Sequence, residues 1–407
     1  MAIIRKCHEI RGRMPRTEEP VPNRANEVDG IDRLSSLPNE ILCHILSFLP
    51  TKYAVGTGIL STQWKDLLPL VHNLRIVLDD TERIVPESDA DWNPTSFKDF
   101  VDRLLYVTLR GSPLKPSVES FNLRCCNFDD GQKISRWIEA ALDLKVKKMD
   151  LCIHPDVDPE YFIHSLFGAN IVSLNLQLDY GVNPDEFRFS LPNLEELSLT
   201  RFNAVNALIE CCPKLKVLVL DHCYVPHNSF VRVFVPNLTL LKVYNTLPQH
   251  IGGFELRTPN LEHFLFKGLV PNYVNVKEKL DCLIGARLDL NPYNEPHHYN
   301  EFNERAFTLI KACTNAVNLS LSGEVVRMLA RSARPLPRFP KLSSLLIPNI
   351  DAFGWTLLPT FLNCADKLMN LYLEIPCGNG RFKVFIAYLD GSVSVVRVGG
   401  PQRHDGI

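Results

Sequence analysis

The chain has 407 residues, 45% of them hydrophobic, so most of it can fold, and its length exceeds one ordinary hydrophobic core. A formal net charge of −2 argues against a general binder of nucleic acid or of anionic membranes, because such proteins carry a basic excess on one face. No apolar run reaches the roughly 18 residues of a membrane-spanning helix, and the basic N-terminal residues interrupt any secretory signal, so we expect a protein of the cytoplasm or the nucleus.

Residues 1–30 are polar, mix Arg with Glu, and are interrupted by Pro15, Pro20 and Pro22. They show little hydrophobic periodicity, as is typical of a segment that cannot bury enough apolar surface to fold. We interpret these residues as a disordered arm.

Residues 31–70 predict three short helices. The first carries an apolar stripe at helical spacing, at Ile41, Leu42, Ile45, Leu46 and Leu49. Pro50 ends that helix, and Thr51 is expected to cap the second. Ser61 is expected to cap the third, which carries Trp64. About 40 residues rarely form a stable core alone, so either the rest of the chain or a partner protein must cover part of this apolar surface.

Residues 71–115 are predicted to be a connecting segment with one helix from Ser96 to Leu109. From residue 116 onward the sequence repeats the pattern apolar-x-x-Leu-x-Leu, often preceded by proline. Six copies follow one another at steps of 25, 23, 21, 23 and 23 residues, beginning at Val146, Ile171, Leu194, Leu215, Leu238 and Leu261. A period in the low twenties with this strand signature is the mark of a leucine-rich-repeat solenoid, in which stacking buries the Leu residues of each unit.

More widely spaced copies at Leu342 and Leu368, with weaker ones at Leu288 and Leu319, extend the repeats to residue 376, and residues 377–407 are expected to form a C-terminal cap or tail. Within this tail an alternating stretch from Phe382 to Val398, broken at Asp390-Gly391, predicts a hairpin that caps the solenoid. The predicted fold class is therefore α/β: a small three-helix unit, followed by a solenoid of parallel strands stacked in a curved array over residues 116–376.

The strand positions between the Leu residues are expected to point outward, onto the concave face of the solenoid. Neighbouring strands lie about 4.8 Å apart, so three adjacent repeats bring eight such side chains into one apolar patch with basic edges. The patch consists of Val217, Val219, Leu240, Lys242, Tyr244, His263, Leu265 and Lys267. An exposed apolar cluster rimmed by charge is typical of a binding site, here for a target protein. The alternative is that a loop or the C-terminal segment covers the patch.

Motifs of catalysis and of metal binding are missing from the sequence. We find no Gly-x-Ser-x-Gly elbow, Walker loop, His-Glu-x-x-His or Gly-x-Gly-x-x-Gly. The 12 cysteines are spread along the chain, and the adjacent pairs lack the spacing of a zinc site: Cys125-Cys126, Cys211-Cys212 and His222-Cys223. Cys126 and Cys223 occupy the ninth repeat position, where Asn or Cys caps the turn inside a solenoid. We therefore expect no metal, no cofactor and no enzymatic activity.

The stretch from residue 31 to 64 resembles the F-box, in the version found in the large plant F-box/leucine-rich-repeat family. The motifs that carry the resemblance occur in the family's order: Leu37-Pro38, then Leu49-Pro50-Thr51-Lys52, then Leu60-Ser61-Thr62-Gln63-Trp64. The repeats that follow also match the family. Two departures are Thr62-Gln63, where basic residues are common, and Leu68, where a second tryptophan is common.

The resemblance implies a substrate-recognition subunit of an SCF-type cullin-RING ubiquitin ligase. The F-box would dock a Skp-type adaptor and, through it, a cullin, while the repeats would bind an unknown protein target for ubiquitination. Carried over residue by residue, the adaptor contacts are Leu37, Pro38, Ile41, Leu42, Ile45, Leu46, Leu49, Pro50, Val55, Leu60, Ser61 and Trp64.

Two other functions remain open. In the first, the chain is a leucine-rich-repeat binding module that acts outside a ligase, and the apolar face of its helices is buried against residues 71–115. In the second, the concave face binds a small molecule that joins receptor and target, as in plant hormone receptors of similar build.

Overall fold

The structure is a computed structural model. It describes residues 34, 36–81, 94–114, 116–166, 168–178, 190–223, 230–246, 252–291, 299–332, 334–348, 350–377, 380–389 and 392–398. The predicted disordered arm lies outside these residues. Contacts divide the chain into two units, Met1–Pro38 and Asn39–Ile407, and all helices and strands named below belong to the second unit.

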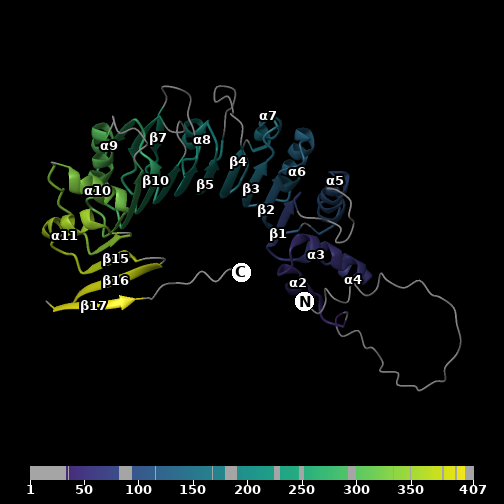
Figure 1. Cartoon of the computed structure of the whole chain (residues 1–407). Coiled ribbons are helices and arrows are strands. Elements are labelled where there is room, and N and C mark those ends of the chain that lie inside the picture. The colour runs from purple at the N-terminus through teal and green to yellow at the C-terminus, as the bar shows by residue number, and fades with distance from the viewer. Residues whose placement is uncertain are drawn as a thin grey trace, which may run out of the picture. The chain divides into compact units, whose positions relative to one another are not determined.

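Three short helices open this unit, as predicted: α2 (Asn39–Ser47), α3 (Thr51–Gly56) and α4 (Thr62–Lys65), with 3-10 turns at η1 (Thr57–Ile59) and η2 (Leu68–Leu70). We call residues 39–70 the helical module (Figure 1). Ser61 caps α4 as predicted, because its hydroxyl accepts a hydrogen bond from the backbone N–H of Trp64 at 3.5 Å. The prediction that Thr51 caps the second helix is wrong: Pro50 takes the cap position without a side-chain bond, and the Thr51 hydroxyl bonds elsewhere.

In the described residues one sheet has fourteen strands, which we call the main sheet. Its parallel strands are β1 (Leu74–Asp79), β2 (Val118–Cys125), β3 (Lys148–Ile153), β4 (Ser173–Leu178), β5 (Glu196–Thr200), β6 (Val217–Asp221), β8 (Leu240–Asn245), β10 (His263–Leu269), β12 (Gly285–Asn291), β13 (Asn318–Leu321), β14 (Ser344–Ile347) and β15 (Asn370–Cys377). The antiparallel strands β16 (Gly380–Leu389) and β17 (Ser392–Val398) complete it, which confirms the predicted C-terminal hairpin.

The repeat Leu residues form the core, because alternate side chains of each strand point to the same face. In β5, β6 and β8 the pairs Leu197 and Leu199, Leu218 and Leu220, and Leu241 and Val243 are all buried. Each pair lies opposite the next in register, so the core continues from one repeat to its neighbour. The predicted fold class, α/β with helices followed by a leucine-rich-repeat array of parallel strands, is confirmed.

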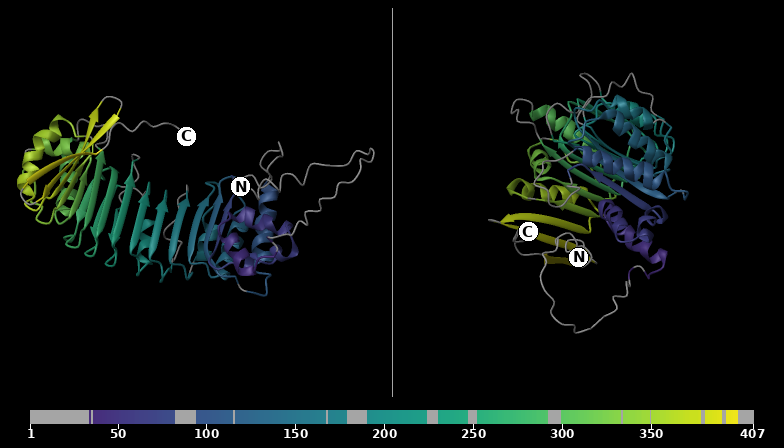
Figure 2. Two further views of the ribbon diagram at one scale, coloured as in Figure 1. Left: turned by 90° about the horizontal axis from the view of Figure 1, so that it is seen from below. Right: turned by 90° about the vertical axis from the view of Figure 1, so that its right-hand side faces the viewer.

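Helices cover one face of the main sheet and leave the other open, and the sheet curves away from the helices (Figure 2). The covering elements are α5 (Pro94–Asp102), the π-helical η3 (Arg103–Leu109), α6 (Gly131–Asp143), α7 (Glu160–Ile163), η4 (His164–Leu166), α8 (Val205–Glu210), α9 (Tyr299–Ala312), α10 (Gly323–Arg331) and α11 (Ala352–Cys364). The predicted helix over residues 96–109 is present as α5 and η3.

Two features extend the predicted architecture. The first strand, β1, lies inside the stretch predicted to be a connecting segment, so the main sheet begins at Leu74. A second sheet on the helix side consists of three parallel strands, β7 (Val231–Phe234), β9 (Gly253–Arg257) and β11 (Tyr273–Val276). The edge of β7 is covered by α8, because Asn206 bonds the carbonyl of Phe230 at 2.7 Å and the N–H of Arg232 at 2.8 Å.

Candidate functional site

The helical module divides its apolar side chains between an interior and a surface. Leu42, Leu46 and Trp64 are buried and hold the helices together, although the resemblance carried them over as adaptor contacts. Ile41 and Leu60 are 47% and 42% exposed. The other carried-over residues divide between exposed Pro38 and Pro50 and half-buried Leu37, Ile45, Leu49, Val55 and Ser61. The module therefore presents part of the predicted contact set to a partner and uses the rest as its own core.

Further apolar side chains of the module are exposed that the resemblance did not point to. Phe48, at the end of α2, is 73% exposed, and Ile59, in the turn before α4, is 80% exposed. Tyr53 on α3 is also exposed. The helical stripe could not reveal them, because Phe48 and Tyr53 lie off the buried face and Ile59 lies in a turn. Together with Ile41 and Leu60, they form what we call the exposed apolar set of the module.

The module is tied to the main sheet by one buried hydroxyl. Thr51 accepts a hydrogen bond from the N–H of Val77 at 2.8 Å and donates one to the carbonyl of Arg75 at 3.3 Å. Both groups belong to β1, on the side of that strand that faces away from β2. The side chain that the sequence suggests as a helix cap thus satisfies two backbone groups at the sheet's first edge.

The open face of the main sheet brings the eight predicted target-binding residues together. Across β6, β8 and β10, the register aligns Val217 with Leu240 and His263. A second row aligns Val219 with Lys242 and Leu265, and in a third Tyr244 lies opposite Lys267. All eight side chains are partly or well exposed. The prediction that these residues are neighbours on one face is confirmed, whereas their role in binding a target stays a prediction.

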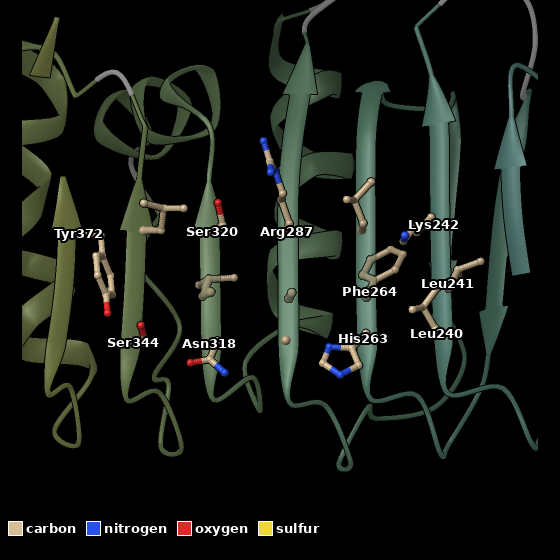
Figure 3. Close-up of a pocket in the computed structure, with 15 residues that line it drawn as sticks. Leu240, Leu241, Lys242, His263, Phe264, Arg287, Asn318, Ser320, Ser344 and Tyr372 are labelled. Carbon is tan, nitrogen blue, oxygen red and sulfur yellow. The ribbon is translucent and has the colours of Figure 1, made fainter. Parts of the chain in front are cut away.

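A hollow of about 630 Å³ lies on this face, from β8 to β15 (Figure 3). Four of the predicted residues line it: Leu240, Lys242, His263 and Leu265. The remaining residues of the patch, Val217, Val219, Tyr244 and Lys267, lie outside it. Its other outward-facing residues, which the sequence analysis did not single out, are Gly285, Arg287, Asn318, Ser320, Ser344, Leu346 and Tyr372. The hollow is therefore displaced toward the C-terminal strands from the predicted patch.

Small residues in the middle of these rows create the hollow. Gly285 lies opposite His263 on one side and Asn318 on the other. A Cβ atom at Gly285 would lie 2.9 Å from Nδ1 of His263, so even a methyl group would push the imidazole aside. Ser320 and Ser344 place short side chains on the next two strands, between the longer side chains of Arg287 and Tyr372 (Figure 3).

Positive charge without an internal partner marks one side of the hollow. Lys242 on β8 and Arg287 on β12 make no hydrogen bond or ion pair with any described residue. Leu265 on β10 separates them in the same row. The lining residues include no carboxylate. The hollow is thus a mainly apolar surface that carries two cations without a partner among the described residues.

The first repeats carry a different arrangement at the same row position. Asn122, Asp150 and Asn175 align across β2, β3 and β4. The Asp150 carboxylate accepts a hydrogen bond from the Asn122 amide and another from the Asn175 amide, each at 2.9 Å. Burial raises the pKa of Asp150, while the bond from Asn175 and the charge of Arg124 oppose that shift. These polar side chains bind one another and leave no apolar surface for a partner.

Several cysteines are buried in the core, among them Cys125, Cys212, Cys223 and Cys313. Cys223 is buried after β6, and its thiol donates to the carbonyls of Leu199 at 3.3 Å and Asp221 at 3.8 Å, which confirms its predicted place inside the turn. Burial raises its pKa to about 12, so the thiol stays protonated. The described residues hold no group of three or more His, Cys, Asp or Glu side chains arranged to bind a metal ion. Among them, too, none of the helices combines the length and the apolar character needed to cross a bilayer.

Comparisons with known proteins agree with this architecture. The F-box domain family matches residues 34–75. The F-box/LRR-repeat protein At4g14103 of Arabidopsis thaliana is 32% identical over 360 residues, which cover 84% of this chain and 91% of that protein. The F-box/LRR-repeat proteins At4g14096 and At5g38396 of the same plant are each 31% identical over 84% of this chain, and the matches cover 73% and 78% of their own lengths.

Proposed function

The chain belongs to the F-box/LRR-repeat protein family, and from this membership we propose that it is the substrate-recognition subunit of an SCF-type cullin-RING ubiquitin ligase. The helical module docks a Skp-type adaptor and through it a cullin, and the open face of the main sheet binds a protein target. The subunit makes and breaks no bonds itself. It acts in the cytosol or the nucleus by holding the target close to a charged ubiquitin carrier, which raises their effective concentration.

The observation that carries the proposal is the exposed apolar set of the helical module. Ile41 and Leu60 are well exposed although both are large apolar residues. An apolar helical surface that fits a groove of another protein is a common recognition mode. If the chain were a binding module outside a ligase, its helices would bury this face against residues 71–115, and the exposure of Ile41 and Leu60 does not favour that alternative.

The burial pattern also refines the proposed contacts. We assign direct adaptor contact to the exposed and half-buried members of the predicted set. Leu42, Leu46 and Trp64 have a supporting role, because truncating a buried side chain removes packing inside the module rather than contact with a partner. Exposed Phe48 and Ile59 extend the proposed contact surface beyond the motif residues.

The test measures adaptor binding by the full chain and by a surface variant. We expect a recombinant Skp-type adaptor to bind the wild-type chain, and the double variant Ile41→Asp, Leu60→Asp to bind at least about 100-fold more weakly, since two charges enter an apolar contact. The matched control is Val107→Asp, which changes a side chain that is 70% exposed on η3. It should bind the adaptor as the wild type does.

Two results would contradict the proposal. A folded wild-type chain that does not bind the adaptor would leave a repeat module that acts outside a ligase. Binding that survives the double variant, with the control also unchanged, would place the adaptor on another surface of the chain.

A further inference from the structure

We propose that the hollow on the open face binds an extended peptide segment of the target that combines acidic with apolar side chains. This inference rests on the proposed function, because it describes the target that the repeats would capture. It depends on three properties of the hollow: its uncompensated charge, its length across the strands, and the order of side chains along one row.

Charge defines the first requirement on the peptide. Within the described part of the chain Lys242 and Arg287 have no hydrogen-bond or ion-pair partner, and the residues that line the hollow include no carboxylate. A ligand that covered these cations with apolar groups alone would remove them from water without replacing their hydration. A ligand with carboxylates would instead form charge-assisted hydrogen bonds with both. The bound peptide should therefore carry acidic residues where it lies over Lys242 and Arg287.

Length favours a peptide segment over a compact ligand. The lining runs from Leu240 on β8 to Tyr372 on β15 and crosses six strands. With neighbouring strands about 4.8 Å apart, five steps span about 24 Å, the length of about seven extended residues. Lys242 and Arg287 lie two strands apart, so their backbones are separated by about 10 Å. In the polyproline II form of an extended peptide, positions i and i+3 share a face and lie about 9 Å apart, so carboxylates at these two positions would reach both cations.

The order of side chains along the hollow predicts which part of the peptide is acidic and which is apolar. Along one row the register places Lys242, Leu265 and Arg287, then Ser320, Leu346 and Tyr372. In this row the cations lie on β8 and β12 with Leu265 between them, and Leu346 and the aromatic Tyr372 lie on β14 and β15. The acidic residues of the peptide should lie at one end of the contact and its large apolar residues at the other.

The experiment compares three labelled heptapeptide pools for binding to the full chain by fluorescence anisotropy. One pool has Asp or Glu at positions one and four and Leu, Val, Phe or Ser elsewhere. In the second pool Lys or Arg replaces the acids, and in the third Gln replaces them. A heptathymidylate oligonucleotide serves as a polyanion of another class. Two double variants change the hollow. The Glu variant is Lys242→Glu with Arg287→Glu, and the Gln variant is Lys242→Gln with Arg287→Gln. The matched control, Lys279→Glu with Arg338→Glu, changes exposed cations outside the hollow.

We expect the wild type and the control to bind the acidic pool at least about 30-fold more tightly than the other pools, as loss of one member of a desolvated charge pair suggests. The Gln variant should lose this preference, and the Glu variant should prefer the basic pool. A wild-type preference for the neutral or basic pool, an acidic preference that the Glu variant retains, or equal binding of the oligonucleotide would each overturn the proposal.

Adaptor binding is measured on the same preparations, and it separates this inference from the proposed function. Adaptor binding without any peptide preference refutes the acidic segment and leaves the ligase role standing. A peptide preference that reverses with charge, in a chain that does not bind the adaptor, supports the hollow as a peptide site and removes the ligase role.

Discussion

The two ends of the open face use the same row position in opposite ways. In the first repeats Asp150 lies between Asn122 and Asn175, and its carboxylate accepts hydrogen bonds from both amides. In the later repeats Lys242 and Arg287 have no such neighbours and stand beside Leu265. The parallel scaffold is the same in both. A polar side chain that bonds to its own sheet contributes to stability, whereas one that is left without a partner is available to another molecule.

The largest expected effect is on stability, and it tests whether the two ends of the main sheet differ on the open face alone. Leu199 in β5 and Phe266 in β10 are fully buried on the opposite face. Leu199→Ala and Phe266→Ala should each lower the free energy of unfolding by about 2–5 kcal/mol, because each leaves a cavity. Leu265→Ala, one position from Phe266 but on the open face, should lower it by less than about 1 kcal/mol. Chemical denaturation measures all three, and tolerance of Leu199→Ala alone would show that the cores differ as well.

The next effect compares the two kinds of polar residue directly. Asp150→Ala removes the acceptor for two amide groups, and each unmade bond inside a protein costs about 1–3 kcal/mol. The free energy of unfolding should fall by at least about 1 kcal/mol. Arg287→Ala, at the same row position, should change it by less than about 0.5 kcal/mol. Equal losses in the two variants would mean that Arg287 is held by the sheet and is not available to a ligand.

The smallest effect is a pH dependence of the polar end. Burial raises the pKa of Asp150 above its ordinary value of 3.8, so between these two pKa values the folded chain holds a proton that the unfolded chain has lost. The associated stability is present below pH 3.8 and is lost as the pH rises through the folded pKa. Asp150→Asn has no such proton. Its free energy of unfolding, relative to that of the wild type, should therefore increase between about pH 4 and pH 7. A difference that does not change with pH would show that burial does not raise the pKa of Asp150.

The sequence predicted the repeats well because their signal is local. Each apolar-x-x-Leu-x-Leu copy lies within six residues, and each predicted copy occurs as a strand of the main sheet. The first strand was missed although Leu74, Ile76 and Leu78 alternate, because no proline stem or preceding copy marks it as a repeat. The eight patch residues were correctly placed as neighbours, since their positions follow from the strand period alone.

The hollow could not be placed in the same way. Its depth depends on Gly285 lying opposite His263 and on small residues in β13 and β14, and the connection from β12 to β13 is longer than the repeat period. The repeat period shows where large apolar side chains lie on the sheet, but a hollow forms where side chains are small. Similarly, Thr51 has the sequence position of a helix cap, and only the arrangement of α3 beside β1 shows its actual partner.

The bond between Thr51 and β1 has a consequence for the life of the protein in the cell. An uncovered edge strand is a template on which other chains can aggregate, and native proteins cover such edges. Here the covering residue belongs to the helices that the proposed adaptor would bind. A cleaved chain that lacked these helices would expose the carbonyl of Arg75 and the N–H of Val77. Such a chain would lose the proposed adaptor surface and the cover of the first edge strand together, so one cleavage would remove a docking site and create a site for aggregation.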